Sequence, residues 1–287
     1  MTLLQEEIDR PTAAAHLLTI DNQVVTLVLT RFIHNELTKA RFQRAVLGLS
    51  GGIDSALSCY LAAKALGPEN VLAVRMPYKA SSHESLDHAQ LVIEDLGVQS
   101  ETVDITPMVE PLFAASPEIN ATRKGNIMAR MRMTILFDRS AAWRALVVGT
   151  SNKSEMLLGY GTIYGDLASA VNPLGDLYKT QVRQLSRFLG VPQPIIDKPP
   201  SADLIPGQTD ESDLGFTYAE VDRLLYMLVD ERYSTDECVE VGYPRSFVQT
   251  ALEMVRKAQY KRVMPIIPKL TSRTIGHDFR YLRDWGT

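Results

Sequence analysis

Hydrophobic and polar positions change period several times along the chain, and each period predicts an element. Apolar residues recur at helical spacing through residues 12–38, which predicts an N-terminal helix. Four short apolar runs predict strands at 45–50, 70–77, 101–105 and 145–150. Between them, amphipathic stretches predict helices at 54–66, 83–96 and about 121–143. Strands that alternate with helices of this length indicate βαβ units, so we expect an α/β fold with a doubly wound, mostly parallel sheet.

The pattern changes after residue 170. Helices are predicted at 177–189, 218–230 and 246–258, and a segment rich in Pro, Asp, Ser and Gly lies between the first two. We expect a single domain over residues 1–287 with four parts. These are an N-terminal helical segment, an α/β core, a loop segment, and C-terminal helices with a basic tail, at 1–40, 41–190, 191–217 and 218–287.

Composition excludes several classes of protein. A hydrophobic content of 45% and a charged content of 22% are typical of a globular chain. The net charge of −4 argues against chain-wide attraction to nucleic acid or to an anionic membrane. Cys59 and Cys238 lack metal-ligand spacing and indicate a reducing compartment, and the acidic start of the chain does not resemble a signal peptide. We therefore expect a cytoplasmic protein with neither a nucleic-acid nor a membrane partner.

The first candidate site is the turn "SGGIDS" at residues 50–55, between a predicted strand and a predicted helix. Free backbone N–H groups at a helix start attract phosphate, and glycines leave room for it. Asp54 would repel a phosphate unless a cation lay between them, so it fits a Mg²⁺ ligand. The simpler alternative is a tight turn in which Asp54 caps the helix. The turn lacks the lysine of a Walker phosphate loop.

Two motifs carry a resemblance to a known family. The stretch "LSGGIDS" resembles the loop of the ATP pyrophosphatase (PP-loop) family, whose members release pyrophosphate while they adenylate a substrate. The block "GTSNKSEMLLGYGTIYGDLASAVNPLGDLYKTQVRQL" at 149–185 resembles NAD synthetases. The chain as a whole resembles their ammonia-dependent type. The resemblance implies a PP-loop core, related to adenine-nucleotide hydrolases, with extra N- and C-terminal helices. It also implies an AMP-forming ligase, which agrees with the missing Walker lysine.

Site residues follow from that resemblance. It implies Mg²⁺ on Asp54 and Glu155, and ATP on Gly48, Leu49, Ser50, Gly51, Gly52, Ile53, Asp54, Ser55, Thr150, Lys179 and Ser201. No side-chain nucleophile is expected. From the residues alone, Glu155 could equally be a solvated helix residue and Thr150 a simple cap.

The dinucleotide substrate, deamido-NAD, is implied to contact Arg130, Asp166 and Lys261. Taken alone, Arg130 and Arg132 would be surface arginines that face different sides of one helix. A basic run such as that around Lys261 is usually a solvated face.

The Pro-rich segment has two interpretations. Its composition alone favours a linker between domains. By resemblance it is a mobile loop over the active site, in which Lys198 and Ser201 contribute to ATP binding.

Three positions depart from the ammonia-dependent pattern. Ile163, Ala170 and Tyr260 stand where a lysine, an acidic residue and a histidine are common, and all three concern the dinucleotide. The sequence of the block at 149–185 resembles more closely the synthetase half of the glutamine-using branch. No glutaminase is recognisable in the chain, so we expect ammonia as nitrogen donor, either free or from a separate glutaminase.

The implied reaction is the ATP-dependent amidation of deamido-NAD to NAD, with a homodimer as the implied assembly. Three alternatives stay open. They are a PP-loop enzyme that modifies tRNA, another PP-loop amide ligase that resembles GMP synthetase, and a non-catalytic ATP-binding module.

Overall fold

The computed structural model describes residues 18–200, 210–263 and 265–275, and its centre is one parallel sheet. The strands lie in the order β3-β2-β1-β4. They are β1 (Ala45–Gly48), β2 (Val71–Arg75), β3 (Gln99–Thr102) and β4 (Leu146–Val147). In the register of the sheet, Ala45 pairs with Val71 on one side and with Leu146 on the other. All these pairings are parallel, which confirms the expected α/β sheet.

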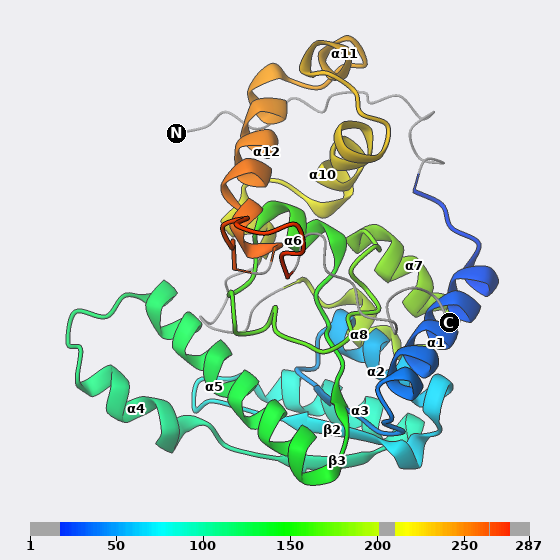
Figure 1. The fold of residues 1–287 in the computed structure, drawn as a ribbon, viewed down its shortest axis with the longest axis vertical. Helices are drawn as coiled ribbons and strands as arrows, with labels where there is room; N and C mark the ends of the chain where they lie inside the picture. Colours follow the sequence, from blue (N-terminus) through cyan, green and yellow to red (C-terminus); the bar gives the residue numbers. More distant parts are fainter. Residues whose placement is uncertain (1–17, 201–209, 264, 276–287) are drawn as a thin grey trace.

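Helices cover both faces of the sheet because its side chains alternate. Ala45 and Leu47 belong to the core on one face, whereas Val46 belongs to the core on the other. The first core is closed by α1 (Asn22–Lys39), α2 (Ile53–Leu66), α3 (His83–Leu96), α7 (Lys179–Leu189) and α8 (Gln193–Asp197). The second is closed by α4 (Thr106–Ala114) and α5 (Ala121–Trp143). The sheet is therefore doubly wound, with α4 and α5 grouped on one side of it in Figure 1.

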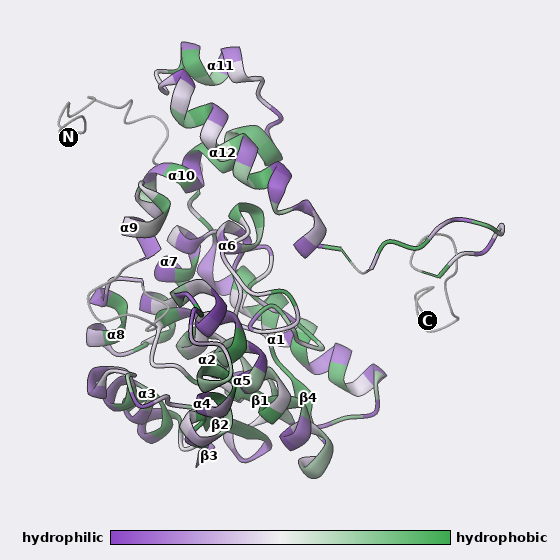
Figure 2. Cartoon of the chain, turned by 90° about the vertical axis from the view of Figure 1, so that its left-hand side faces the viewer, coloured by the Kyte–Doolittle hydropathy of each residue, from purple (hydrophilic) through white to green (hydrophobic). Residues whose placement is uncertain are grey.

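The C-terminal helices form a separate group at the end of the molecule opposite β3 (Figure 1). The group comprises α9 (Asp210–Leu214), α10 (Tyr218–Leu225), a π-helical turn (Tyr226–Asp230), α11 (Thr235–Glu240) and α12 (Arg245–Lys257). It packs on α6 (Lys153–Leu158) through the buried side chains of Leu158 and Val221. Figure 2 shows residues 265–275 extending away from the body of the protein. None of the helices in the described ranges has both the length and the apolar character that crossing a membrane requires.

Most predicted elements lie within a residue or two of the observed ones, and the exceptions have physical reasons. The predicted helix 12–38 begins at Asn22, because the Asp21 side chain caps it by accepting from the backbone N–H of Gln23 and Val24; residues 12–17 lie outside the described part. The strand predicted at 101–105 is β3 at Gln99–Thr102, a polar and mostly exposed edge strand that an apolar pattern misplaces. The helix predicted at 218–230 leaves α geometry after Leu225 and ends in the π-helical turn.

Candidate functional site

The loop after β1 is shaped by its own serines and by one glycine. Gly51 adopts φ +80°, and a Cβ there would lie 2.1 Å from the carbonyl oxygen of Ser85. Ser55 Oγ donates to the Gly52 carbonyl (2.9 Å) and accepts from the Ser50 N–H (3.2 Å). Gly52 is the N-cap of α2 and contributes no side-chain cap. The alternative in which Asp54 caps this helix is therefore wrong, and the start of α2 is free to hold an anion.

Asp54 instead joins a cluster with two residues from distant parts of the chain. Lys179 Nζ lies 2.5 Å from Asp54 Oδ2 and 3.0 Å from Glu155 Oε1. The Lys179 side chain is only 3% exposed, so water does not screen these pairs. Glu155 is thus not a solvated helix residue. Three elements, α2, α6 and α7, bring the two predicted metal residues within hydrogen-bond distance of the predicted phosphate residue, Lys179.

Burial and neighbouring charges shift the pKa values of this cluster. Burial raises the pKa of Glu155, the Lys179 ammonium opposes that shift, and the nearby Asp54 carboxylate adds to it. Burial lowers the pKa of Lys179, but the carboxylates of Asp54 and Glu155 outweigh burial and leave it above its ordinary value. Lys179 therefore stays protonated at neutral pH.

A capping box orients Glu155. The Asn152 side chain accepts from the Glu155 N–H (3.0 Å), and Glu155 Oε2 accepts from the Asn152 N–H (3.3 Å). The Asn152 amide then donates to Asp54 Oδ1 at 2.8 Å. Sequence reasoning did not single out Asn152, although the spacing of Asn and Glu in "NKSE" is a recognisable helix start.

Asp222 of α10 orients Lys179 indirectly, through Ser154 and the backbone of Thr180. This aspartate is fully buried and accepts from Ser154 Oγ (2.5 Å) and from the Thr180 N–H (2.8 Å). Ser154 Oγ also accepts from the Lys179 N–H (2.9 Å). Nothing in the local sequence pointed to Asp222, because it meets its partners only in the folded chain.

A cavity of about 600 Å³ opens over this cluster at the carboxyl ends of β1, β2 and β4. Among the predicted ATP residues, its walls include Gly48, Leu49, Ser50, Gly52, Ile53, Asp54, Ser55, Thr150 and Lys179. Gly51 lies just behind the wall, against the backbone of Ser85. Ser201 lies outside the described residues. The cavity thus gathers residues that are about 130 positions apart in the sequence.

The predicted substrate residues divide into two groups. Asp166 and Lys261 line the cavity, and Lys261 Nζ donates to the carbonyls of Gly159 (2.7 Å) and Gly161 (2.8 Å). Arg130 does not line it. Its side chain is exposed and donates to the carbonyl of Ile163 at 3.3 Å. Arg132 is the arginine of this helix that reaches the cavity, where its Nε donates to the Met76 carbonyl at 3.0 Å.

The Pro-rich segment 191–217 is not one continuous loop, because it contains α8 and α9, and residues on both sides of 201–209 lie at the cavity. Lys198 Nζ donates to Ser85 Oγ at 2.8 Å, and both residues belong to the wall. Asp210 is buried in the same wall, and its N–H donates to the Pro200 carbonyl at 2.8 Å. A linker between domains would not place two separate parts of its length in the wall of one site.

A second cavity, of about 1110 Å³, lies at the amino end of β1 and is lined by Arg41, Arg44 and Arg144 among others. None of the predicted site residues borders it. Despite its larger volume, it is the smaller cavity at the carboxyl ends of the strands that carries the candidate chemistry, as expected for a parallel sheet.

The residues at the cluster suit a divalent cation. Asp54 and Glu155 already converge on one cation, the Lys179 ammonium. In the part of the chain that the structure describes, no group of three or more His, Cys, Asp or Glu side chains gathers as a complete metal site. Mg²⁺ commonly takes one or two carboxylates and completes its shell with phosphate oxygens and water, so the two carboxylates fit Mg²⁺ carried by a nucleotide.

Comparison with known proteins agrees with the geometry. The family model for NAD synthase matches residues 25–265. The chain belongs to the NAD synthase family. A relative from Trichlorobacter lovleyi, named NH(3)-dependent NAD(+) synthetase, is 58% identical over 269 residues, which cover 94% of this chain and 98% of the relative. The resemblance to NAD synthetases is thus confirmed, and this relative carries the ammonia-dependent name although the block at 149–185 resembles the glutamine-using branch.

Solved structures of this family share the fold. An NH3-dependent NAD synthetase from Campylobacter jejuni gives a TM-score of 0.75 at 36% identity and covers 87% of this chain and 100% of that one. An NMN synthetase from Francisella tularensis gives a TM-score of 0.78 at 30% identity, with 88% and 100% covered. Both confirm the doubly wound α/β fold.

Proposed function

We propose that this NAD synthase family member is an ATP-dependent amide ligase that converts deamido-NAD and ammonia into NAD, AMP and pyrophosphate. The observation that carries the proposal is the meeting of Asp54, Glu155 and Lys179 beside the open N-terminus of α2. Two carboxylates, one buried ammonium and free helix amides together suit a metal-bound triphosphate whose pyrophosphate leaves. The 58% identical relative supports the choice of substrate and of ammonia as donor.

The reaction proceeds in two steps, adenylation of the carboxylate and then amidation. A carboxylate oxygen of deamido-NAD attacks the α-phosphorus of ATP, and the bond to the bridging oxygen of pyrophosphate breaks. Ammonia then attacks the carbonyl carbon of the acyl-adenylate, AMP leaves, and the nitrogen loses a proton. Lys179 and the amides of the loop stabilise charge on the leaving pyrophosphate. Mg²⁺, held by Asp54 and Glu155, supplies further charge neutralisation when bound. No side-chain nucleophile takes part.

Residues of the outer cavity would bind the dinucleotide. Lys261 and Asp166 face the same space as the loop, and burial lowers the pKa of Lys261 while Asp166 opposes that shift. Lys261 Nζ donates to the carbonyls of Gly159 and Gly161, and its ammonium suits the pyrophosphate of deamido-NAD. Arg130 would need to leave the Ile163 carbonyl, or to act on a ligand at the rim, to take the same role. Ala170 and Tyr260 lack the carboxylate and the imidazole that are common at these positions. The proposed contacts to the dinucleotide are therefore those of Lys261 and Asp166.

The Pro-rich segment would act as a lid over the acyl-adenylate. Lys198 and Asp210 of this segment belong to the cavity wall, so the segment would help to exclude water from the intermediate.

A second copy of the chain is the proposed partner. Val24, Leu27, Val28 and Phe32 form an exposed apolar stripe on α1, on the side away from buried Ile33 and Leu37.

Cys59 and Cys238 are free and buried, which suits the proposed cytoplasmic location.

A product assay tests the proposal. The protein is incubated with ATP, Mg²⁺, ammonium and deamido-NAD, and the expected products are NAD, AMP and pyrophosphate. Parallel reactions with deamido-NMN, because of the structural likeness to an NMN synthetase, and with glutamine test the substrate and the donor. ADP as product, or no turnover of deamido-NAD, would contradict the proposal.

Substitutions at the two carboxylates test the metal role. Asp54→Asn and Glu155→Gln keep the shape of the side chains but remove a negative charge, so turnover should fall by about 10²-fold or more while the fold is retained. Asp236→Asn serves as the matched control, because that aspartate is exposed on α11, pairs with Arg245 and does not line the cavity. Near-normal AMP production by both site variants would contradict the assignment of Asp54 and Glu155 as metal ligands.

A further inference from the structure

The position of Lys179 raises a question about the order in which metal and nucleotide bind. Its ammonium bridges Asp54 and Glu155 at 2.5 and 3.0 Å, and these are the two carboxylates proposed to hold Mg²⁺. The centre of the Tyr218 ring lies 5.2 Å from the same ammonium and contributes a cation–π contact. The chain's own cation therefore occupies the space between the two carboxylates and balances one of their two negative charges.

Lys179 and a metal ion cannot both have these carboxylates to themselves. Mg²⁺ binds oxygen at about 2.0–2.1 Å and demands near-octahedral geometry. An ammonium has three N–H donors, and two of those on Lys179 already point at Asp54 and Glu155. A metal that takes these oxygens must turn the ammonium away from at least one of them, and two cations a few ångströms apart in a buried site repel each other strongly.

The released ammonium needs another anion. The buried Asp210 carboxylate is a third anion near Lys179 and raises the pKa of Lys179. It also raises the pKa of Glu155, so it adds negative charge to the cluster. ATP brings further anions within reach of the ammonium, because its phosphates would lie between the start of α2 and Lys179, at the wall that both share. The backbone N–H of Lys179 is held by Ser154 Oγ, so only the flexible side-chain stem has to move.

We propose that Lys179 is an internal counter-ion that is exchanged for the divalent metal when the nucleotide binds. In the ATP-free protein its ammonium offsets part of the negative charge of Asp54 and Glu155, occupies their oxygens and disfavours metal binding. In the ATP-bound protein the metal takes both carboxylates and the ammonium turns to a phosphate. This inference rests on the proposed function, since it concerns the same ATP site. Metal and ATP must then bind with positive coupling: each is bound weakly alone and tightly together.

Titration of Mn²⁺, followed by its electron paramagnetic resonance signal, tests the exchange on the full chain. Lys179→Met removes the charge but keeps a side chain of similar length. In the absence of ATP, this variant should bind Mn²⁺ about tenfold more tightly than the wild type, because the competing cation is gone. With a non-hydrolysable α,β-methylene ATP present, the variant should instead bind the nucleotide about tenfold more weakly. The two effects have opposite signs, which a general loss of structure cannot produce.

The control is Lys153→Met, which removes another largely buried ammonium, at the start of α6. Lys153 pairs with Asp176 (3.1 Å) and Asp230 (2.7 Å) and is not among the proposed ATP or metal residues, so the ATP-free Mn²⁺ affinity should stay within about twofold of the wild type. Should Lys179→Met fail to fold, the wild type alone decides. Its melting temperature should rise little with Mn²⁺ or the nucleotide analogue alone and more than additively with both.

Equal or weaker Mn²⁺ binding by folded Lys179→Met without ATP would overturn the exchange, as would additive melting shifts in the wild type. This outcome is separate from the failure of the proposed function. Metal titration does not depend on NAD formation, so a protein that makes NAD but shows no exchange refutes only the role of Lys179 as counter-ion. A protein that shows the exchange but makes no NAD refutes only the proposed substrate.

Discussion

Replacing Gly51 by alanine places a methyl group against the backbone of α3. Gly51 adopts φ +80°, a left-handed conformation in which other residues lose about 1–2 kcal/mol. The added Cβ would lie 2.1 Å from the Ser85 carbonyl oxygen, and an ordinary contact of 3.4 Å requires the loop and α3 to separate by about 1.3 Å. Overpacking against such fixed atoms adds about 1–3 kcal/mol. We expect Gly51→Ala to lower the free energy of unfolding by about 2–5 kcal/mol.

Two other glycines separate the components of that loss. Gly97 adopts φ +65° with nothing within 4 Å of the added Cβ, so Gly97→Ala should show the backbone strain alone, about 1–2 kcal/mol. Gly52 has φ −89°, and its Cβ would meet only Ser50 Oγ at 3.4 Å, so Gly52→Ala should disturb the phosphate cradle without the collision.

The assay is urea unfolding of the three variants together with calorimetric titration of an ATP analogue. Gly51→Ala should be the least stable and should bind the analogue at least about tenfold more weakly, because the amides of the loop are displaced. Gly97→Ala should bind it normally. If Gly51→Ala and Gly97→Ala lose equal stability, within about 0.5 kcal/mol, and bind the nucleotide alike, the geometry of the loop described above is wrong.

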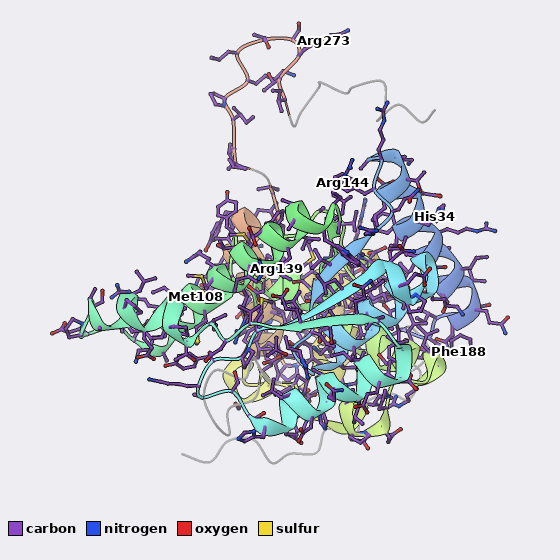
Figure 3. All side chains as sticks on the ribbon, turned by 90° about the horizontal axis from the view of Figure 1, so that it is seen from below. His34, Met108, Arg139, Arg144, Phe188 and Arg273 are labelled. Atoms are coloured by element: carbon purple, nitrogen blue, oxygen red, sulfur yellow. The ribbon has the colours of Figure 1, made fainter. Side chains whose placement is uncertain are left out.

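Two further predictions concern residues outside the loop. Arg139 of α5, labelled in Figure 3, holds Glu101 of β3 through two hydrogen bonds of 2.8 Å and lowers the pKa of its carboxyl, so Glu101→Gln should lower the free energy of unfolding by about 0.5–1 kcal/mol at pH 7. Because the folded pKa is the lower one, that difference should be full above the ordinary glutamate pKa of about 4.3 and vanish as the pH falls through the folded value; a constant difference from pH 7 to pH 2 in urea titrations would contradict it. Asp222→Asn should lower the stability by about 1–3 kcal/mol and also reduce kcat/KM for ATP, and its effect should be non-additive with Ser154→Ala, whereas additive effects would show that the two residues do not orient Lys179 together.

The core elements could be predicted from the sequence because their local signals agree with the fold. The helix at 83–96 begins after Ser82, whose side chain caps it, and ends at Gly97, which adopts a left-handed conformation. The strands β1 and β2 are apolar because both of their faces are covered by helices. The edge strand β3 is mostly exposed and consists of polar residues, so no apolar run marks its position in the sequence.

Several short helices could not be predicted in the same way. No hydrophobic period announces the six residues of α6, yet Glu155 lies in its first turn. This helix is defined by its capping box and by the contact of Ser154 with Asp222, which is 68 positions away. Tertiary contacts of this kind decide a short helix, whereas local propensity does not.

The site shows the same division. Motif wording identified Asp54, Glu155 and Lys179, and the structure brings all three together. It does not bring Arg130 to the cavity, because that position lies on the outer side of α5, while Arg132 lies on the inner side. A spacing of two on a helix separates the faces but does not say which face is inward.

Transfer of an oxygen isotope tests the central claim, the formation of an acyl-adenylate, most directly. Deamido-NAD labelled with ¹⁸O in its nicotinate carboxylate is turned over with ATP, Mg²⁺ and ammonium, and the products are analysed by mass spectrometry. Attack of the carboxylate on the α-phosphorus predicts one ¹⁸O atom in each AMP formed and the other in the amide of NAD. AMP without label, or label in pyrophosphate or inorganic phosphate, would contradict it.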